Sequence, residues 1–176
     1  MPLVTDEQKE KRESTFLKYE TDNILEIKSN LYRVESHYIK AQNKFVACHK
    51  EECSFCKANI NKQIEYNYFV NLNGNTGIMN IKPSVFFNIN AIERASKKDK
   101  RDISWLVIKT GSGLDTEYTV SKNENIENKM TEEELKSNNE KLDNLMKQKE
   151  IQLEANYEEL LEEVNPEEVN PEEVPF

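Results

Sequence analysis

The sequence predicts a mainly β chain of the α+β class: one small sheet domain followed by a charged helix and an acidic tail. Three observations support this. Short segments that alternate apolar and polar residues fill 24–120, leucines recur at helical spacing after Thr131, and the chain closes with EEVNPEEVNPEEVPF. A chain of 176 residues accommodates one ordinary domain plus appendages. We therefore divide it into four parts, namely 1–22, 23–122, 123–163 and 164–176.

Charge separates the predicted domain from the C-terminal part of the chain. Residues 1–122 contain 19 Lys and Arg against 16 Asp and Glu, a net charge of +3, whereas residues 123–176 contain 5 against 17, a net charge of −12. The overall charge of −9 therefore describes the C-terminal part, and it does not exclude binding of a polyanion by the domain. No stretch approaches the roughly 18 consecutive apolar residues of a membrane span, and the N-terminus lacks the apolar core of a signal peptide. We expect a protein that is neither membrane-bound nor secreted.

The first elements are a short arm and a series of strands. Thr5 and Asp6 are good helix caps and precede charged helix formers, so residues 1–22 are expected to form a basic, helical N-terminal arm. Alternation with a period of two then predicts short strands. They are expected at 24–27, 32–34, 38–39, 45–46, 66–70, 78–81, 103–108 and 118–120.

One helix is expected within the strand region. Pro83 and Ser84 begin it, and Val85, Ile89 and Ile92 recur at helical spacing before a basic run at 97–101. Strands, one short helix and further strands favour an OB-fold barrel over 23–122, although propensity alone leaves other small sheet folds open.

The C-terminal part is predicted to be a helix and a disordered tail. Thr131 and Glu134 form a capping box, and a row of apolar residues follows at helical spacing. Lys149 and Asn156 interrupt this row, which leaves two alternatives: a solvated single helix, or a coiled-coil dimer. Beyond residue 163, a proline in every five residues and repeated glutamates predict an extended, disordered acidic tail.

The most specific motif is CHKEECSFCK at 48–57, which contains all three cysteines. Thiolate and imidazole are the ligands that zinc prefers, and four of them in a tetrahedron make a closed structural site. Cys48, Cys53 and Cys56 are the expected sulfur ligands, and the fourth is His37 or His49. His37 is favoured because consecutive residues of an extended chain point to opposite faces, so Cys48 and His49 would diverge. The sequence therefore predicts one structural Zn²⁺.

Basic and aromatic residues alternate between 40 and 118. Proteins that bind single-stranded nucleic acid need cations along the phosphates and exposed rings on which bases stack. Tyr66, Tyr68 and Trp105 are the preferred stacking candidates, and a structural role is the alternative for each of them. The full set of candidate contacts is Lys40, Lys44, Lys57, Tyr66, Tyr68, Lys82, Arg94, Lys97, Lys98, Lys100, Arg101, Trp105, Lys109 and Tyr118.

Together these features resemble the helix-destabilising single-stranded-DNA-binding proteins of tailed bacteriophages. The shared pattern covers roughly 11–122 and the tail: a histidine upstream of Cys-x4-Cys-x-x-Cys, a strand rich in tyrosine and phenylalanine, a helix, and a Gly-x-Gly loop followed by DTEYTV at 115–120. The resemblance implies an OB fold with a zinc subdomain and His37, Cys48, Cys53 and Cys56 as its ligands. It further implies a virus-encoded protein of the infected host's cytoplasm that coats DNA during replication, recombination and repair.

The two ends of the chain also resemble known motifs. The N-terminal arm resembles the basic Ser-Thr motif by which family members contact a neighbouring copy on DNA, through Lys11, Arg12, Ser14 and Thr15. Glu13 departs from this motif, because the family has a basic residue at that position. Glu172, Glu173, Val174, Pro175 and Phe176 resemble the acidic tip of bacterial single-strand-binding proteins. That tip implies recruitment of replication and recombination proteins.

We expect no catalytic activity. The loop TGSGLDT at 110–116 lacks the Gly-Lys-Ser/Thr of a phosphate-binding loop and precedes a strand. His49 and Glu51 match the His-x-Glu of zinc deaminases, but the Pro-Cys-x-x-Cys that accompanies it there is absent. The alternative to single-strand binding is a zinc-containing adaptor, or a DNA-mimicking inhibitor, that binds proteins through its helix and acidic tail.

Overall fold

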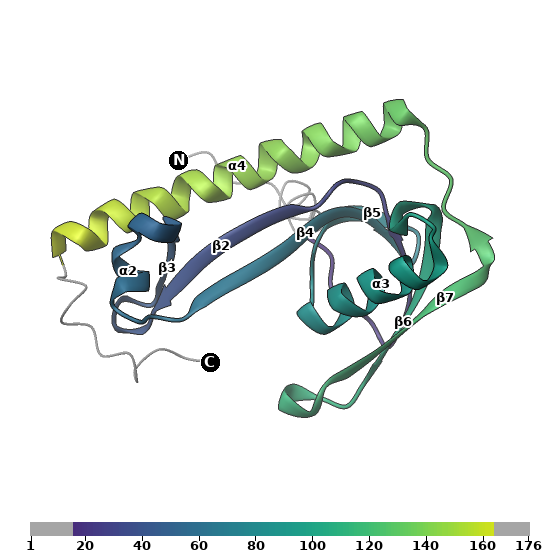
Figure 1. The fold of residues 1–176 in the computed structure, drawn as a ribbon, viewed down its shortest axis with the longest axis horizontal. Helices are drawn as coiled ribbons and strands as arrows, with labels where there is room; N and C mark the ends of the chain where they lie inside the picture. The colour runs from purple at the N-terminus through teal and green to yellow at the C-terminus, as the bar shows by residue number, and fades with distance from the viewer. Residues whose placement is uncertain (1–15, 164–176) are drawn as a thin grey trace, which may run out of the picture. The chain divides into compact units, whose positions relative to one another are not determined.

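The computed structural model describes residues 16–163, which form a mainly antiparallel sheet with a long C-terminal helix (Figure 1). The chain divides into two compact units. Unit 1 comprises 16–32 and 66–142, and unit 2 comprises 33–65 and 143–163. The predicted basic arm residues Lys11, Arg12, Ser14 and Thr15, and the predicted tail at 164–176 with its tip Glu172, Glu173, Val174, Pro175 and Phe176, lie outside the described residues.

The strands expected from alternation are confirmed, with two of them merged into one. The strands are β1 (Asp22–Ile27), β2 (Tyr32–Ile39), β3 (Lys44–Ala47), β4 (Lys62–Leu72), β5 (Asn75–Ile81), β6 (Ile103–Thr110) and β7 (Glu117–Glu127). The helices are α2 (Ser54–Lys57), α3 (Pro83–Ser96) and α4 (Glu132–Glu163). The expected helix does not extend to residues 16–20, because Leu17 donates its N–H to the carbonyl of Ile78 at 2.8 Å, beside β5.

Unit 1 has antiparallel pairings of β1 with β4, β4 with β5, β1 with β6, and β6 with β7. Side chains two residues apart on these strands face one core, as the pleat requires. Val85 and Ile89, four residues apart on α3, close that core. Among the described residues no pairing joins β5 to β7, so the predicted barrel is not closed.

Unit 2 pairs β2 with β3 through the register His37 with Val46 and Tyr38 with Phe45. Its interior contains Val34, Val46, Phe55 and Ile60, together with a row from α4. That row is Met146, Leu153, Tyr157 and Leu160. Their spacings of seven, four and three residues place them on one face of a helix.

Both alternatives for the C-terminal helix need correction, because α4 buries its apolar row against the rest of its own chain. The capping box is present: Glu134 donates its N–H to Oγ1 of Thr131 at 3.1 Å. The two residues that interrupt the apolar row have partners in unit 2. Lys149 pairs with Glu65 at 2.6 Å, and the Asn156 amide donates to the carbonyl of Phe45 at 2.8 Å. The predicted boundary at 122–123 falls inside β7, which continues to Glu127.

No helix within 16–163 combines the length and the apolar character that a bilayer crossing requires.

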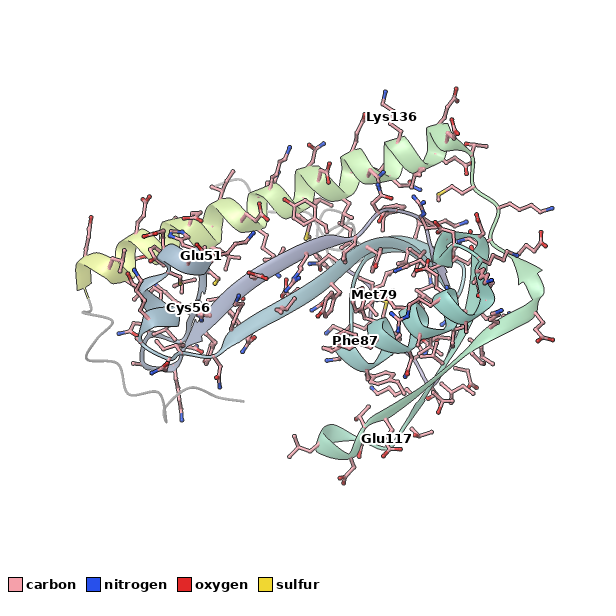
Figure 2. All side chains as sticks on the ribbon, viewed as in Figure 1. Glu51, Cys56, Met79, Phe87, Glu117 and Lys136 are labelled. Carbon is pink, nitrogen blue, oxygen red and sulfur yellow. The ribbon has the colours of Figure 1, made fainter. Side chains whose placement is uncertain are left out.

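The hairpin between β6 and β7 depends on Gly111, and Figure 2 shows Glu117 close to its end. Gly111 has φ +77°, and a Cβ there would lie 2.2 Å from the carbonyl oxygen of Asp115. Gly113 also has positive φ, at +57°, but a Cβ there would meet nothing within 4 Å. Both glycines therefore have a positive φ, but only at Gly111 would a side chain collide with the backbone.

We expect Gly111→Ala to destabilise unit 1 by clearly more than the roughly 1–2 kcal/mol that a left-handed conformation costs an L-residue. Gly113→Ala is the matched control and should lose only about that amount. Urea unfolding followed by the fluorescence of Trp105, the single tryptophan, measures both losses. Equal losses would show that the contact with Asp115 is relieved without cost.

Candidate functional site: a metal-ligand cluster and a lysine-lined groove

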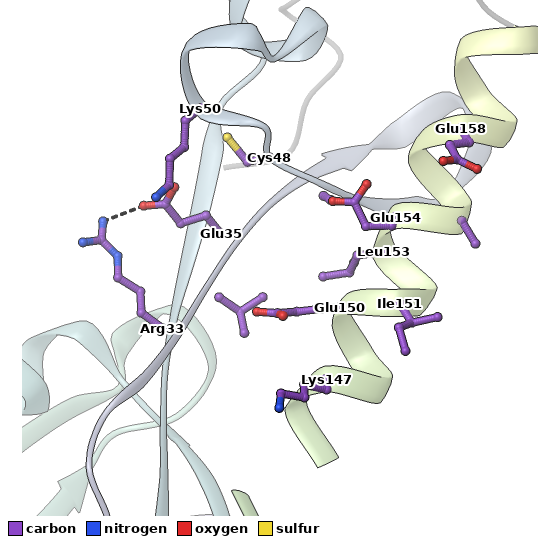
Figure 3. A pocket seen from close by; sticks show the side chains of 13 residues that line it. Arg33, Glu35, Cys48, Lys50, Lys147, Glu150, Ile151, Leu153, Glu154 and Glu158 are labelled. Atoms are coloured by element: carbon purple, nitrogen blue, oxygen red, sulfur yellow. Dashed lines mark ion pairs between the residues drawn. The ribbon is translucent and has the colours of Figure 1, made fainter. Parts of the chain in front are cut away.

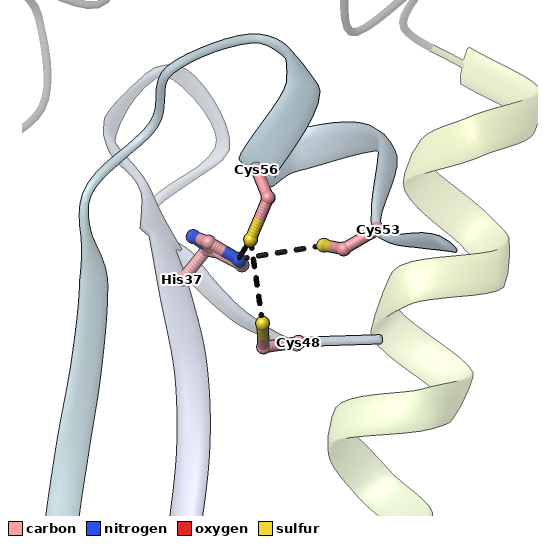
Figure 4. Close-up of side chains that lie close together, drawn as sticks. All are labelled: His37, Cys48, Cys53 and Cys56. Atoms are coloured by element: carbon pink, nitrogen blue, oxygen red, sulfur yellow. Dashed lines mark hydrogen bonds between the residues drawn. The ribbon is translucent and has the colours of Figure 1, made fainter. Parts of the chain in front are cut away.

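Four predicted ligands meet in unit 2. His37, Cys48, Cys53 and Cys56 each offer one atom, and these atoms all lie within 4.8 Å of one another (Figure 4). Nε2 of His37 is 3.4 Å from Sγ of both Cys53 and Cys56, and Sγ of Cys48 is 3.5 Å from Sγ of Cys56. The cluster could therefore bind one metal ion.

Local structure explains why these four converge. His37 points inward from β2 and is fully buried. Cys48 follows β3, which is paired with β2, and its N–H donates to the carbonyl of Glu35 at 3.2 Å. Cys53 and Cys56 lie at the two ends of a single helical turn, α2, which directs both sulfurs toward the imidazole. A hairpin thus supplies two ligands and a tight turn supplies the other two.

The orientation of His37 suits metal binding. Its Nδ1 lies 3.1 Å from the carbonyl oxygen of Asn61. Since a carbonyl can only accept, Nδ1 carries the proton and Nε2 keeps its lone pair toward the sulfurs. Burial, the largest effect, lowers the pKa of His37, so the imidazole is neutral at pH 7.

The thiols differ in acidity. Burial opposes ionisation of Cys53, yet backbone N–H groups, first that of Cys56, bring its pKa below the usual value for a thiol. Burial and then the hydrogen bond with Cys48 raise the pKa of Cys56 to about 12, and the charge of Cys53 adds to this. Three thiolates so close together repel one another unless a cation lies among them. A divalent ion would compensate this repulsion and release the protons.

His49, the other candidate ligand, lies outside the cluster. Its Nε2 contacts the carboxylate of Glu154 at 2.7 Å, and its ring lies against that of Tyr157. The side chains of Cys48 and His49 therefore point in different directions, as expected for consecutive residues of an extended chain.

We expect His37→Gln to lose tightly bound metal, with affinity falling by more than the roughly 10–100-fold that loss of an outer-shell partner costs. His49→Gln should keep one metal ion per chain. Metal content after gel filtration, measured by elemental analysis, separates the two variants. Retention of metal by His37→Gln together with its loss from His49→Gln would reverse the assignment.

Comparisons with known family models, curated proteins and solved structures find no match. Any functional assignment therefore depends on the geometry and the sequence of this chain itself.

A groove of about 860 Å³ lies in unit 1 on the side where β5 and β7 are not paired with each other. Its walls are residues 16–19, the end of β5 with the start of α3, and the β6–β7 hairpin. Lys18, Lys82 and Lys109 line it, and none of the described residues that line it is acidic. The three ammonium groups have no hydrogen-bonding or ion-pairing partner within the described part of the chain. We call this feature the lysine groove.

Rings and an uncapped helix end complete the lysine groove. Phe16 is 52% exposed, and the Tyr19 and Tyr118 rings lie 5.0 Å apart. Lys82 is the N-cap of α3, where no side chain caps the helix and no acidic residue occupies the first turn. The partial positive charge at this end of the helix adds to that of the lysines. The groove can therefore accept an anionic, ring-bearing chain.

The lysine groove contains three predicted contacts, Lys82, Lys109 and Tyr118, and it adds three residues that sequence reasoning missed. Phe16, Lys18 and Tyr19 were assigned to a helical arm, so nothing in the sequence placed them beside β5. The signal available was their composition, two rings around a lysine just before the first strand.

Other predicted contacts lie elsewhere. Arg94, Lys97 and Lys98 are exposed or partly exposed in or just after the last turn of α3, outside the lysine groove. Lys100 and Arg101 already pair with Glu93 and Asp99. In unit 2, Lys44 pairs with Glu159, while Lys40 and Lys57 are exposed.

The preferred stacking candidates need correction. Trp105 is 0% and Tyr68 2% exposed, because both rings belong to the core of unit 1. The Trp105 indole N–H donates to the carbonyl of Lys100 at 3.0 Å, which completes its burial. Tyr66 is 8% exposed and stacks on Phe86 at 3.9 Å. A base cannot reach these faces without opening the core, so the rings of the lysine groove replace them as candidates.

Unit 2 contains a second hollow, of about 910 Å³, beside Cys48 (Figure 3). Glu35, Glu150, Glu154 and Glu158 line it with Arg33, Lys50 and Lys147, and Arg33 is paired with Glu35 at 2.8 Å. Four carboxylates against three cations would repel a phosphate chain. The lysine groove is therefore the better candidate for a polyanion.

Proposed function

We propose that this chain is a non-catalytic, sequence-independent single-stranded-DNA-binding protein with one structural zinc ion. The lysine groove is the observation that carries the proposal. Three lysines that lack partners among the described residues line it together with exposed or partly exposed rings, and no described residue contributes a carboxylate to its lining. Cations that follow phosphates, with rings for bases, are what unpaired nucleic acid needs.

The strand pairings of unit 1 support an OB-type arrangement. β1, β4, β5, β6 and β7 would be its five strands, with α3 between the third and the fourth. OB folds are partly open barrels that bind nucleic acid on the second and third strands and at the loop between the fourth and fifth. The lysine groove is lined by β5 and by the β6–β7 hairpin, the corresponding positions.

The donor set and its spacing support zinc. Zn–S bonds of about 2.3 Å and Zn–N bonds of about 2.0–2.1 Å in a tetrahedron separate two sulfurs by about 3.8 Å, and a sulfur and a nitrogen by about 3.5 Å. The corresponding distances are 3.5 Å for Cys48–Cys56 and 3.4 Å for His37 to Cys53 and to Cys56. When bound, the ion would join β2, β3 and α2 and supply no open position for chemistry.

The remaining roles rest on the resemblance found in the sequence. We propose that the protein is virus-encoded, acts in the host cytoplasm during replication, recombination and repair, recruits partner proteins through its acidic tail and self-associates on DNA.

An oligonucleotide titration tests the proposal. If three lysines neutralise three phosphates, the log–log dependence of affinity on salt should have a slope of about −2, since each phosphate of a single strand contributes about −0.7. Binding of fluorescent poly-dT should therefore weaken roughly 20-fold between 50 and 200 mM salt. Absence of binding at 50 mM salt, with the fold intact, would reject the proposal in favour of a protein-binding adaptor.

A further inference from the structure

Tyr157 of α4 contacts the loop that carries the metal ligands. Its hydroxyl accepts a hydrogen bond from the N–H of Ser54 at 3.2 Å, and its ring centre lies 3.9 Å from that of His49 and 5.2 Å, edge-on, from that of Phe55. Ser54 and Phe55 are the two residues between Cys53 and Cys56, and His49 follows Cys48. One buried side chain thus touches a neighbour of every cysteine.

These contacts act where the loop is weakest. α2 spans only Ser54–Lys57, and no side chain of its N-cap, Cys53, caps it. A single turn is far below the length at which a helix is stable alone, and its first N–H groups lack partners within the helix. The Tyr157 hydroxyl supplies the partner for Ser54, and the ring covers Phe55.

Besides the Tyr157–Ser54 hydrogen bond, four polar contacts join residues 143–163 of α4 to 33–65 of the same unit. Two involve residues next to or near the metal loop: Glu154 with His49 at 2.7 Å, and Glu159 with Lys44 at 3.1 Å. The others are the contacts of Lys149 with Glu65 and of Asn156 with the Phe45 carbonyl. Tyr157 is therefore held against the loop from both sides along the helix.

We propose that Tyr157 is a positioning residue of the metal site, and that it couples metal occupancy to the docking of residues 143–163 of α4. This inference rests on the metal-binding half of the proposed function and is independent of DNA binding. Coupling of this kind is reciprocal: if the docked helix holds the metal more tightly, the bound metal holds the helix more tightly by the same factor.

The rate of metal release tests whether the docked helix holds the metal more tightly. Chains loaded with Co²⁺, whose thiolate absorption reports the ligand geometry, are mixed with excess chelator. Tyr157→Ala should release the metal at least 10-fold faster than the wild type and change the Co²⁺ spectrum. Tyr157→Phe, which keeps the ring and loses the hydroxyl, should release the metal at a rate between those of the wild type and Tyr157→Ala. Leu142→Ala is the matched control, because it removes a buried side chain of the same helix that lies in unit 1, outside 143–163, and it should release the metal at close to the wild-type rate.

Hydrogen exchange tests the reverse direction on the full chain. Removal of metal should accelerate amide exchange in 143–163 at least 10-fold and leave 132–142 of the same helix unchanged, since that part belongs to unit 1. If the wild-type chain takes up no metal, the metal part of the proposed function fails and this inference fails with it. A different outcome overturns only this inference: the wild type binds metal, Tyr157→Ala releases it at the wild-type rate, and the rate of amide exchange in 143–163 does not depend on the metal.

Discussion

Lys82→Glu combined with Lys109→Glu should weaken binding of poly-dT about 30–150-fold at 50 mM salt. Each change removes a charge-assisted contact of about 1.5–3 kcal/mol at best, only part of which an exposed lysine realises, and it adds a repulsive carboxylate. The salt slope should also fall by about 1.4, because two phosphates would no longer be neutralised. Fluorescence anisotropy at several salt concentrations measures both quantities.

Lys97→Glu combined with Lys98→Glu is the matched control. These two lysines are exposed in the same unit but outside the lysine groove, and the pair changes the total charge by the same amount. The control should weaken binding only a few-fold and leave the slope nearly unchanged. If the two double variants weaken binding equally, net charge and not the groove determines affinity.

Cys53→Ser should abolish tight metal binding and unfold unit 2. Apparent binding free energies of structural zinc in small fingers are about 10–16 kcal/mol, comparable with the whole stability of about 5–15 kcal/mol of an ordinary domain. Cys53 is fully buried, so the serine hydroxyl would also lack solvent. Elemental analysis gives the metal content, and hydrogen exchange in 33–65 reports unfolding.

Ala47→Ser serves as the control because it places a hydroxyl at a buried site in the same unit without removing a ligand. It should retain one metal ion per chain. Trp105 reports unit 1 separately, and its fluorescence should change little in either variant. A Cys53→Ser chain that keeps a full complement of metal and a protected unit 2 would contradict the assignment of Cys53 as a ligand.

Several strands were predictable because buried residues recur at every second position along part of their length. Leu25 and Ile27 on β1, or Trp105 and Val107 on β6, repeat at the two-residue period that alternation detects. Closure of the barrel was not predictable from such local patterns, because it depends on which strands meet at long range. Residues 16–19 run beside β5, and no alternation distinguishes this short extended segment from the end of a helix.

The metal cluster was the most predictable part of the site. Cysteine and histidine have few other roles in such close spacing, and the choice of His37 came from the geometry of an extended chain. The rings that stack on bases were harder to predict, because a tryptophan suits a core and a stacking surface equally well. Burial resolves this ambiguity: Trp105 is fully buried and Phe16 is exposed.

The polar residues within the helix row were misleading for a physical reason. Lys149 and Asn156 interrupt the apolar row of α4, which left a solvated single helix and a coiled-coil dimer as the two alternatives. In the structure each has a fixed partner, Glu65 and the Phe45 carbonyl. A sequence gives the position of a polar residue in a seam but not the distant residue that satisfies it.

The position of Tyr157 in the chain has a consequence for biosynthesis. All four metal ligands lie between His37 and Cys56, and contacts this local form early as the ribosome elongates the chain. Tyr157 is translated about a hundred residues later. The nascent chain can therefore acquire its ion while exchange with the cellular pool is still fast, and α4, which emerges later, would then trap it.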